Sequence, residues 1–159
     1  MKQKFDTETK QKWKDKWRSS ERGQKIMKID KNTPSVYLLR LISKTDLPRR
    51  LASLITQLRL QHIPLNAYLK RFKLVNSVRC LACGANAKTV SHFLLQCPSY
   101  AHEQWALERN LRRRKKALML ENLLGDPEAI NPLINFIDTS HRFLYNPHPT
   151  LPMPSNSTI

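Results

Sequence analysis

The chain has 159 residues, about the length of one domain, and its 28 lysines and arginines against 12 acids give a formal net charge of +16. Such an imbalance points to a polyanionic partner, nucleic acid before an anionic membrane. The number of cysteines is odd and the N-terminus has no apolar secretion signal, which argues against a secreted protein. No apolar run approaches the roughly 20 residues that a membrane span needs. We therefore expect an intracellular protein with reduced thiols.

Residues 1–33 predict a basic helical lead-in. Trp13 and Trp17 lie four positions apart and so share one helical face. The cations around them are Lys10, Lys12, Lys14, Lys16 and Arg18. These rings could stack on bases while the amines meet phosphates. Large aromatic side chains at helical spacing more often pack against a neighbouring domain, and packing is the preferred interpretation.

Residues 34–76 predict amphipathic basic helices, although the apolar segment 36–42 fits a strand or a helix equally well. Asp46 is a candidate N-cap, with Pro48 in the first turn. The helix that follows shows apolar residues in the i, i+3, i+4, i+7 pattern, at Leu51, Leu54, Ile55 and Leu58. A second short helix is predicted from Leu65, with inward residues Tyr68, Leu69 and Phe72.

The charge of this region is one-sided. Residues 40–80 hold nine cations and a single acid, Asp46. A merely solvated helix normally carries both signs, so this stretch favours phosphate contacts. The candidate nucleic-acid-binding residues here are Arg49, Arg50, Arg59, Lys70, Arg71 and Lys73.

Residues 77–100 contain every cysteine of the chain, in the pattern C-x2-C-x8-H-x4-C formed by Cys80, Cys83, His92 and Cys97. Gly84, directly after the second thiol, supplies the backbone freedom that a tight turn needs. Three thiolates and one imidazole form a closed tetrahedral set that suits zinc and leaves no position for a substrate. The alternative is three buried free cysteines beside an unrelated histidine. The spacing predicts one structural zinc ion.

Residues 101–145 predict C-terminal helices. The first should run from Tyr100 and end in the basic run Arg112, Arg113, Arg114, Lys115 and Lys116, which could bind phosphate, act as a nuclear-import signal or complement the helix dipole. Asp126 and Pro127 should open another helix, which Pro132 either delays or kinks. Residues 146–159 hold four prolines without periodicity and predict a disordered tail.

The cysteine pattern, with residues 89–98 around its last two ligands, resembles the reverse-transcriptase zinc-binding knuckle of non-LTR (LINE-type) retrotransposon polyproteins. Residues 54–59 and 62–69 are similar to the helical lead-in of that knuckle. Residues 13–23 and 123–127 resemble the flanks of fungal members, in which a ribonuclease H domain comes before the knuckle. One departure is Gln61, where family members often have glycine, so this helix is expected to end differently.

The resemblance implies a mainly α, small helical domain built around one CCHC zinc knuckle, with a basic N-terminal helix and a disordered C-terminal tail. It implies a non-catalytic zinc- and nucleic-acid-binding tail, with element RNA or target DNA as ligand, in the nucleus or a cytoplasmic ribonucleoprotein. The carboxylates of ribonuclease H and the paired aspartates of a polymerase are absent, so we expect no enzyme and a truncated or degenerate copy.

The alternative is a structural element that packs on the polymerase or ribonuclease H domain and binds no nucleic acid itself. The position of the arginines separates the two hypotheses. An exposed face shared by Arg49, Arg59, Arg71 and the knuckle favours binding, whereas scattered or acid-paired arginines favour the structural role. Arg79 and Lys88 are expected to balance the metal site's negative charge or to meet phosphate.

Overall fold

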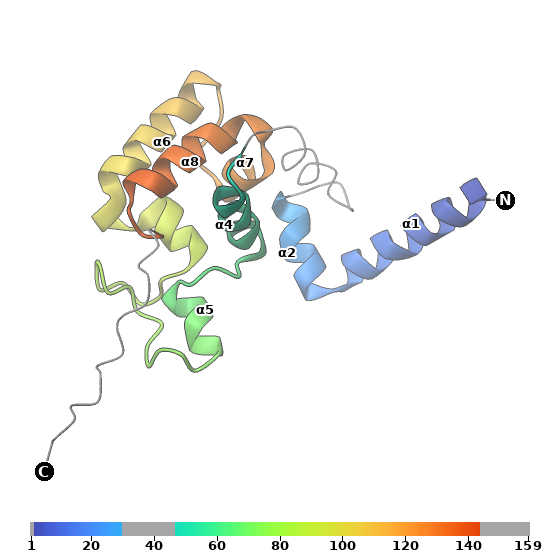
Figure 1. The fold of residues 1–159 in the computed structure, drawn as a ribbon, viewed down its shortest axis with the longest axis horizontal. Coiled ribbons are helices and arrows are strands. Elements are labelled where there is room, and N and C mark those ends of the chain that lie inside the picture. Colours follow the sequence, from blue (N-terminus) through green and yellow to red (C-terminus); the bar gives the residue numbers. More distant parts are fainter. Residues whose placement is uncertain (1, 30–46, 144–159) are drawn as a thin grey trace, which may run out of the picture.

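A computed structural model describes residues 2–29 and 47–143 (Figure 1). Regular structure in these two ranges is entirely helical, which confirms the predicted mainly α fold. The longer helices are α1 (Lys2–Ser19), α2 (Glu21–Ile29), α4 (Arg49–Leu60), α5 (Asn66–Arg71), α6 (Ala101–Arg113), α7 (Leu120–Gly125) and α8 (Ile130–Thr139). Short turns are η1 (His92–Gln96), η2 (Pro98–Tyr100) and η3 (Pro127–Ala129). The predictions for residues 36–42 and 146–159 lie outside the described residues.

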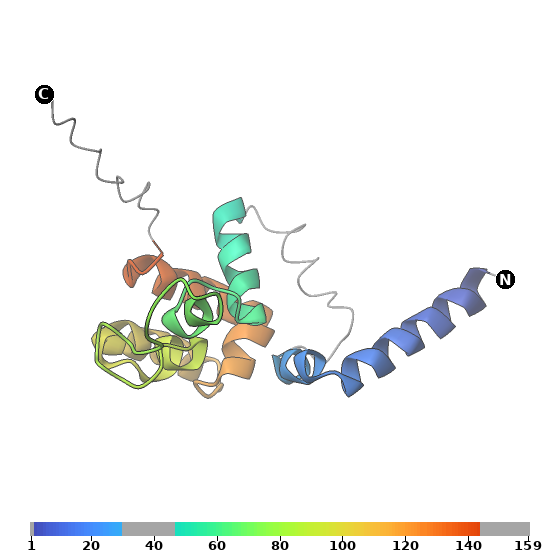
Figure 2. The ribbon, with the colours of Figure 1, turned by 90° about the horizontal axis from the view of Figure 1, so that it is seen from below.

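The N-terminal helix α1 extends away from the body formed by α4–α8, and α2 lies between them (Figures 1 and 2). The corner between α1 and α2 is tight, because a Cβ atom on Gly23 would lie 1.9 Å from the carbonyl oxygen of Trp17. The Ser20 hydroxyl accepts a hydrogen bond from the Gly23 amide at 3.0 Å. Trp13 is 54 % exposed, and the packing of both tryptophans against a preceding or neighbouring domain stays a prediction.

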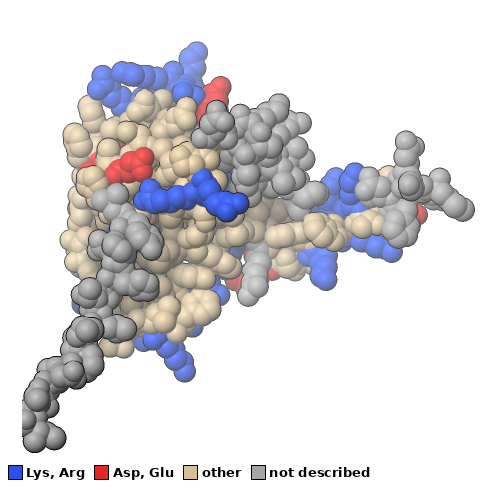
Figure 3. All heavy atoms as spheres, viewed as in Figure 1, with Lys and Arg blue, Asp and Glu red and all other residues tan. Residues whose placement is uncertain are grey.

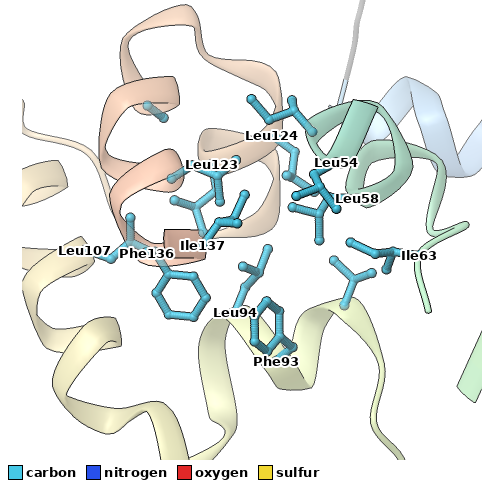
Figure 4. Close-up of a cluster of buried hydrophobic side chains, with 14 of the residues drawn as sticks. Leu54, Leu58, Ile63, Phe93, Leu94, Leu107, Leu123, Leu124, Phe136 and Ile137 are labelled. Atoms are coloured by element: carbon cyan, nitrogen blue, oxygen red, sulfur yellow. The ribbon is translucent and has the colours of Figure 1, made fainter. Parts of the chain in front are cut away.

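The core lies where one face of α4 meets α6, α7 and α8 (Figure 4). Leu54, Ile55 and Leu58 are buried on α4, as the helical spacing predicts. Their partners from the other three helices are Leu107, Leu111, Leu123, Leu124, Leu133, Phe136 and Ile137. None of the described helices is long and apolar enough to cross a membrane.

Helix α4 ends in the left-handed conformation that glycine adopts most easily. Gln61 has φ 57° and ψ 25°, its amide bonds to the Leu58 carbonyl at 3.1 Å, and the His62 amide bonds to the Gln57 carbonyl at 2.9 Å. This is the hydrogen-bond pattern of a glycine-terminated helix. The chain therefore keeps that ending with a glutamine, at the conformational cost that a side chain carries there.

Two predicted helix ends differ from the structure. Pro48 is the N-cap residue of α4 and lies outside its first turn. Helix α5 ends at Arg71, so Phe72 turns outward and is 57 % exposed, contrary to the predicted inward position. The chain reverses there because Lys73 takes a positive φ of 58°.

The C-terminal helices begin and end near the predicted residues. Helix α8 begins late, after the short turn η3, which places Pro132 in its first turn, where no amide donor is needed. The Asp126 carboxylate caps η3 by accepting from the Glu128 amide at 3.0 Å. Helix α6 ends at Arg113, and Lys115 has a positive φ of 55°, so the basic run forms a turn.

Candidate metal centre

The first two ligands lie in a tight turn closed by backbone hydrogen bonds. The Gly84 amide donates to the Cys80 carbonyl at 2.7 Å, and the Cys80 amide donates to the Ala85 carbonyl at 2.9 Å. Gly84 has φ +76°, which side chains rarely adopt. The expected role of this glycine is therefore confirmed.

The last two ligands lie at the ends of η1, which is wider than an α-helical turn. The Cys97 amide bonds to the His92 carbonyl five residues earlier, at 2.8 Å. This spacing brings residues five apart to the same side of the chain, which an α-helix would not do. The Thr89 hydroxyl accepts from the His92 amide at 3.1 Å and holds the start of the turn.

The four predicted ligands come together in space. One ligand atom from each of Cys80, Cys83, His92 and Cys97 lies within 4.8 Å of all the others. The Cys80 and Cys97 sulfurs are 3.8 Å apart, and the Cys83 sulfur is 3.3 Å from His92 Nε2. Zinc–sulfur bonds of about 2.3 Å at a tetrahedral angle place two sulfurs about 3.8 Å apart. The same separation is far too long for a disulfide bond of about 2.05 Å, so the cluster fits one structural zinc.

Two of the thiols are held in different electrostatic environments. Burial raises the pKa of Cys80, but hydrogen bonds from the Cys83 and Ala82 amides and from the His92 and Cys83 side chains outweigh it, and the pKa falls to about 6. Burial raises the pKa of Cys97 to about 11, and the neighbouring thiols Cys83 and Cys80 add to this. A bound cation would hold both as thiolates, so metal binding is coupled to proton release from Cys97.

Lys88 lies beside the cluster and is only 4 % exposed. Burial and the nearby Arg142 lower its pKa, while the negative charge of the three thiols raises it. Its ammonium lies 5.5 Å from the centre of the Tyr100 ring, and its amide bonds to the Val78 carbonyl at 2.8 Å. Three thiolates and one Zn²⁺ carry a formal charge of −1, which the Lys88 ammonium offsets. Because the Lys88 side chain is buried, it is not a phosphate ligand.

The metal cluster is joined to the core through Phe93, the residue after the histidine ligand. Its ring is fully buried and meets three other rings edge-on, at centroid distances of 5.0 Å to Tyr100, 5.2 Å to Phe136 and 5.4 Å to Phe143. Phe93 therefore belongs to the core, and Tyr100 packs against it, so neither ring forms an open surface for stacking bases.

A small helical body that carries one closed Cys3His cluster defines a structural zinc-binding domain. Residues 22–105, slightly more than half of the chain, match the family model described as zinc-binding in reverse transcriptase, and the chain belongs to this family. Comparisons with curated proteins and with solved structures gave no match.

The predicted phosphate-binding cations fall into separate groups. In Figure 3 they lie at the upper end of α6, on the middle of the body and at its lower end near α5. Arg59 is a correction: it is 6 % exposed, and its guanidinium donates to the Leu124 carbonyl. Because this charge is buried and bonded across the core, Arg59 positions α7 against α4 and is not a phosphate ligand. Arg50 is partly engaged, because it donates to the Phe143 carbonyl.

Three of the five cations in the basic run at the end of α6 are paired with acids. Arg112 contacts Glu108 at 2.7 Å, Arg114 contacts Glu128 at 3.5 Å, and Lys116 bonds to Asp126. Burial raises the pKa of the Asp126 carboxyl, but the hydrogen bonds from Lys116 and the Glu128 amide, with the positive charges of Lys116 and Arg114, together outweigh it and lower the pKa. These pairings favour a structural role for the run over phosphate binding.

The surface formed by α5 and the loop after it is different. Lys70, Arg71, Lys73 and Arg79 are all exposed, and we call them the α5 basic surface. The loop is tied to α5, because Lys70 Nζ donates to the Asn76 carbonyl at 3.1 Å and the Asn66 side chain donates to the Arg79 carbonyl at 2.6 Å. Sequence reasoning missed the exposed apolar residues of this surface: Phe72, Leu74, Val78 and Leu81. The sequence did contain an indication of these exposed apolar residues, because apolar and basic residues are interspersed in this segment and no acid occurs among them.

Proposed function

We propose that the protein is a non-catalytic nucleic-acid-binding module of a reverse transcriptase, shaped by one structural zinc and contacting phosphates through the α5 basic surface. One observation carries this proposal: four exposed cations lie within ten residues, and residues 47–102 contain no aspartate or glutamate. Among the described residues these four cations form no ion pair, and none of them is buried. Their positive charge is therefore available to a polyanion.

The arrangement supports affinity without sequence preference. Lysine and arginine contacts to phosphate release counterions, so binding weakens as salt rises. With about four phosphate contacts, affinity should fall about 50-fold for a single strand and about 150-fold for a duplex between about 50 and 200 mM salt.

The test is fluorescence anisotropy with generic RNA and DNA over this salt range. Arg71→Gln and Lys73→Gln should each weaken binding and reduce the salt slope by about one contact. The matched control is Arg112→Gln, because its side chain is also exposed but is paired with Glu108. An unchanged slope in both α5 variants, or a flat salt response of the wild type, would contradict the proposal.

A structural role remains the second candidate, and two observations favour it. Arg49, Arg59 and Arg71 do not share an exposed face, because Arg59 is buried. Leu74 and Leu81 are 69 % and 87 % exposed and offer apolar contacts to a polymerase or ribonuclease H domain. Absence of RNA and DNA binding at about 50 mM salt would favour this candidate.

The context we propose is a LINE-type polyprotein of fungal origin in which this region follows a ribonuclease H domain. The motif resemblances of residues 13–23, 62–69 and 123–127 support it. Its ligand would then be element RNA or target DNA, in the nucleus or in a cytoplasmic ribonucleoprotein. Crosslinking and sequencing of bound RNA from cells that express the intact polyprotein tests this assignment, and recovery of unrelated transcripts alone would contradict it.

A further inference from the structure

Three rings form a ladder along one side of α5. The His62 and Tyr68 rings are stacked, with centroids 5.3 Å apart and an interplanar angle of 27°. The Tyr68 and Phe72 rings are tilted by 56° at 5.0 Å. We call His62, Tyr68 and Phe72 the ring ladder.

The ladder is not part of the core. His62 is exposed, Tyr68 is half-buried, and Phe72, at the end of the ladder, is 57 % exposed. A phenyl ring left in water gives up much of the free energy that burial would supply, and Phe72 is one of four exposed apolar residues between positions 72 and 81. Phe72 makes its ring contact to Tyr68 while more than half of its surface faces solvent.

The chemistry around the ladder indicates which partner it suits. Arg71 and Lys73 are the immediate neighbours of Phe72, and Lys70 lies two residues before Phe72 in α5. Tyr68 also lines a hollow of about 170 Å³, together with Gln61, Arg71, Lys88, Thr89 and others. Aromatic faces between cations suit a ligand with flat rings and negative charges, whereas an apolar protein partner would leave these cations desolvated.

We propose that the ring ladder stacks unpaired bases of single-stranded nucleic acid while the α5 basic surface holds the adjacent phosphates. The inference rests on the proposed function and deepens it, because it names the single strand as the ligand. Bases in a duplex are stacked on one another and cannot offer their faces to Phe72 or Tyr68. A surface that bound phosphates alone would instead favour the duplex, which has the higher charge density.

The experiment compares a labelled RNA single strand of about 12 nucleotides, within the usual site sizes of about 4–16, with an RNA duplex of the same length. Phe72→Ala should weaken single-strand binding about 5- to 100-fold and leave duplex binding within about twofold. Phe72→Trp should retain single-strand affinity, whereas Phe72→Leu should not, because leucine keeps apolar area but has no ring.

The matched control is Trp105→Ala. Trp105 is an aromatic residue on α6 with the same exposure, 57 %, and lies outside the α5 basic surface. Its removal should leave both affinities unchanged. A strand that carries 2-aminopurine gives an independent readout, since stacking on Phe72 should quench its fluorescence in the wild type and not in Phe72→Ala.

The outcomes separate this inference from the proposed function. Equal affinity for single strand and duplex, with no effect of Phe72→Ala, would overturn the stacking and leave phosphate binding intact. No binding of either RNA at about 50 mM salt would overturn both, and the ladder would then be a protein contact. If Phe72→Leu bound the single strand as tightly as the wild type, stacking would also be overturned, because apolar area alone would account for the affinity.

Discussion

Replacing Cys97 by serine tests the metal centre most directly. The substitution keeps the backbone of the turn: the residue 97 amide still donates to the His92 carbonyl, and its carbonyl still accepts from the Tyr100 amide at 3.0 Å. The side chain is fully buried, and serine is slightly smaller than cysteine, so the surrounding packing changes little. What is lost is one of the four ligands, 3.8 Å from the Cys80 sulfur.

The size of the effect follows from mass action. Loss of a hydrogen-bonding partner of a ligand already costs about 10- to 100-fold in metal affinity, so loss of the ligand itself should cost about 100-fold or more. At free zinc about 100 times its Kd, the ion stabilises the wild type by about 2.7 kcal/mol, whereas a site about 100-fold weaker gains about 0.4 kcal/mol. For a chain of this length the difference corresponds to a Tm gap of about 5–9 °C.

The assay pairs zinc stoichiometry by atomic emission with thermal unfolding followed by far-ultraviolet circular dichroism. His102→Asn is the control, because His102 is an exposed histidine on α6 outside the metal cluster. Chelation of the wild type should remove only the part of the helical signal that comes from the turns near the knuckle, since the core also joins α4, α6, α7 and α8. One zinc ion per chain in Cys97→Ser, or a Tm equal to the wild type at the same free zinc, would refute the assigned ligand set.

Three further results are expected. Gln61→Gly should raise the free energy of unfolding by about 0.5–1 kcal/mol in denaturant titrations, because residue 61 has φ 57°, while Gln61→Ala should not. Arg59→Ala should lower it by about 2–3 kcal/mol, through the lost charged hydrogen bond to Leu124, without changing the salt slope of RNA binding. Zinc affinity should rise about tenfold per pH unit near neutrality from Cys97 alone, because its pKa of about 11 keeps it protonated until zinc displaces the proton. Cys80, with a pKa of about 6, should add to that slope only at lower pH, and calorimetry in buffers of different ionisation enthalpy counts the protons.

Local patterns in the sequence predicted much of this molecule. The apolar spacing of Leu54, Ile55 and Leu58 predicted the buried face of α4. Pro132 predicted either a late start or a kink in α8, and the structure shows the late start. The spacing of the cysteines and His92 predicted the ligand set, because the four side chains sit on two short turns with little freedom between them. Each of these features depends on residues within a few positions of one another or within a single loop.

The tertiary structure alone decided which charges and rings meet solvent. Arg59 lies four residues after Ile55 and so falls on the buried side of α4, but its burial is possible only because the Leu124 carbonyl, 65 residues away, accepts its hydrogen bond. Phe72 follows an inward-facing pattern, yet the chain turns at Lys73 and leaves the ring outside. The apolar periodicity of a sequence reports only which residues share one face of a helix. Whether a guanidinium is buried or a ring is exposed depends on whether segments distant in the sequence supply a partner for it.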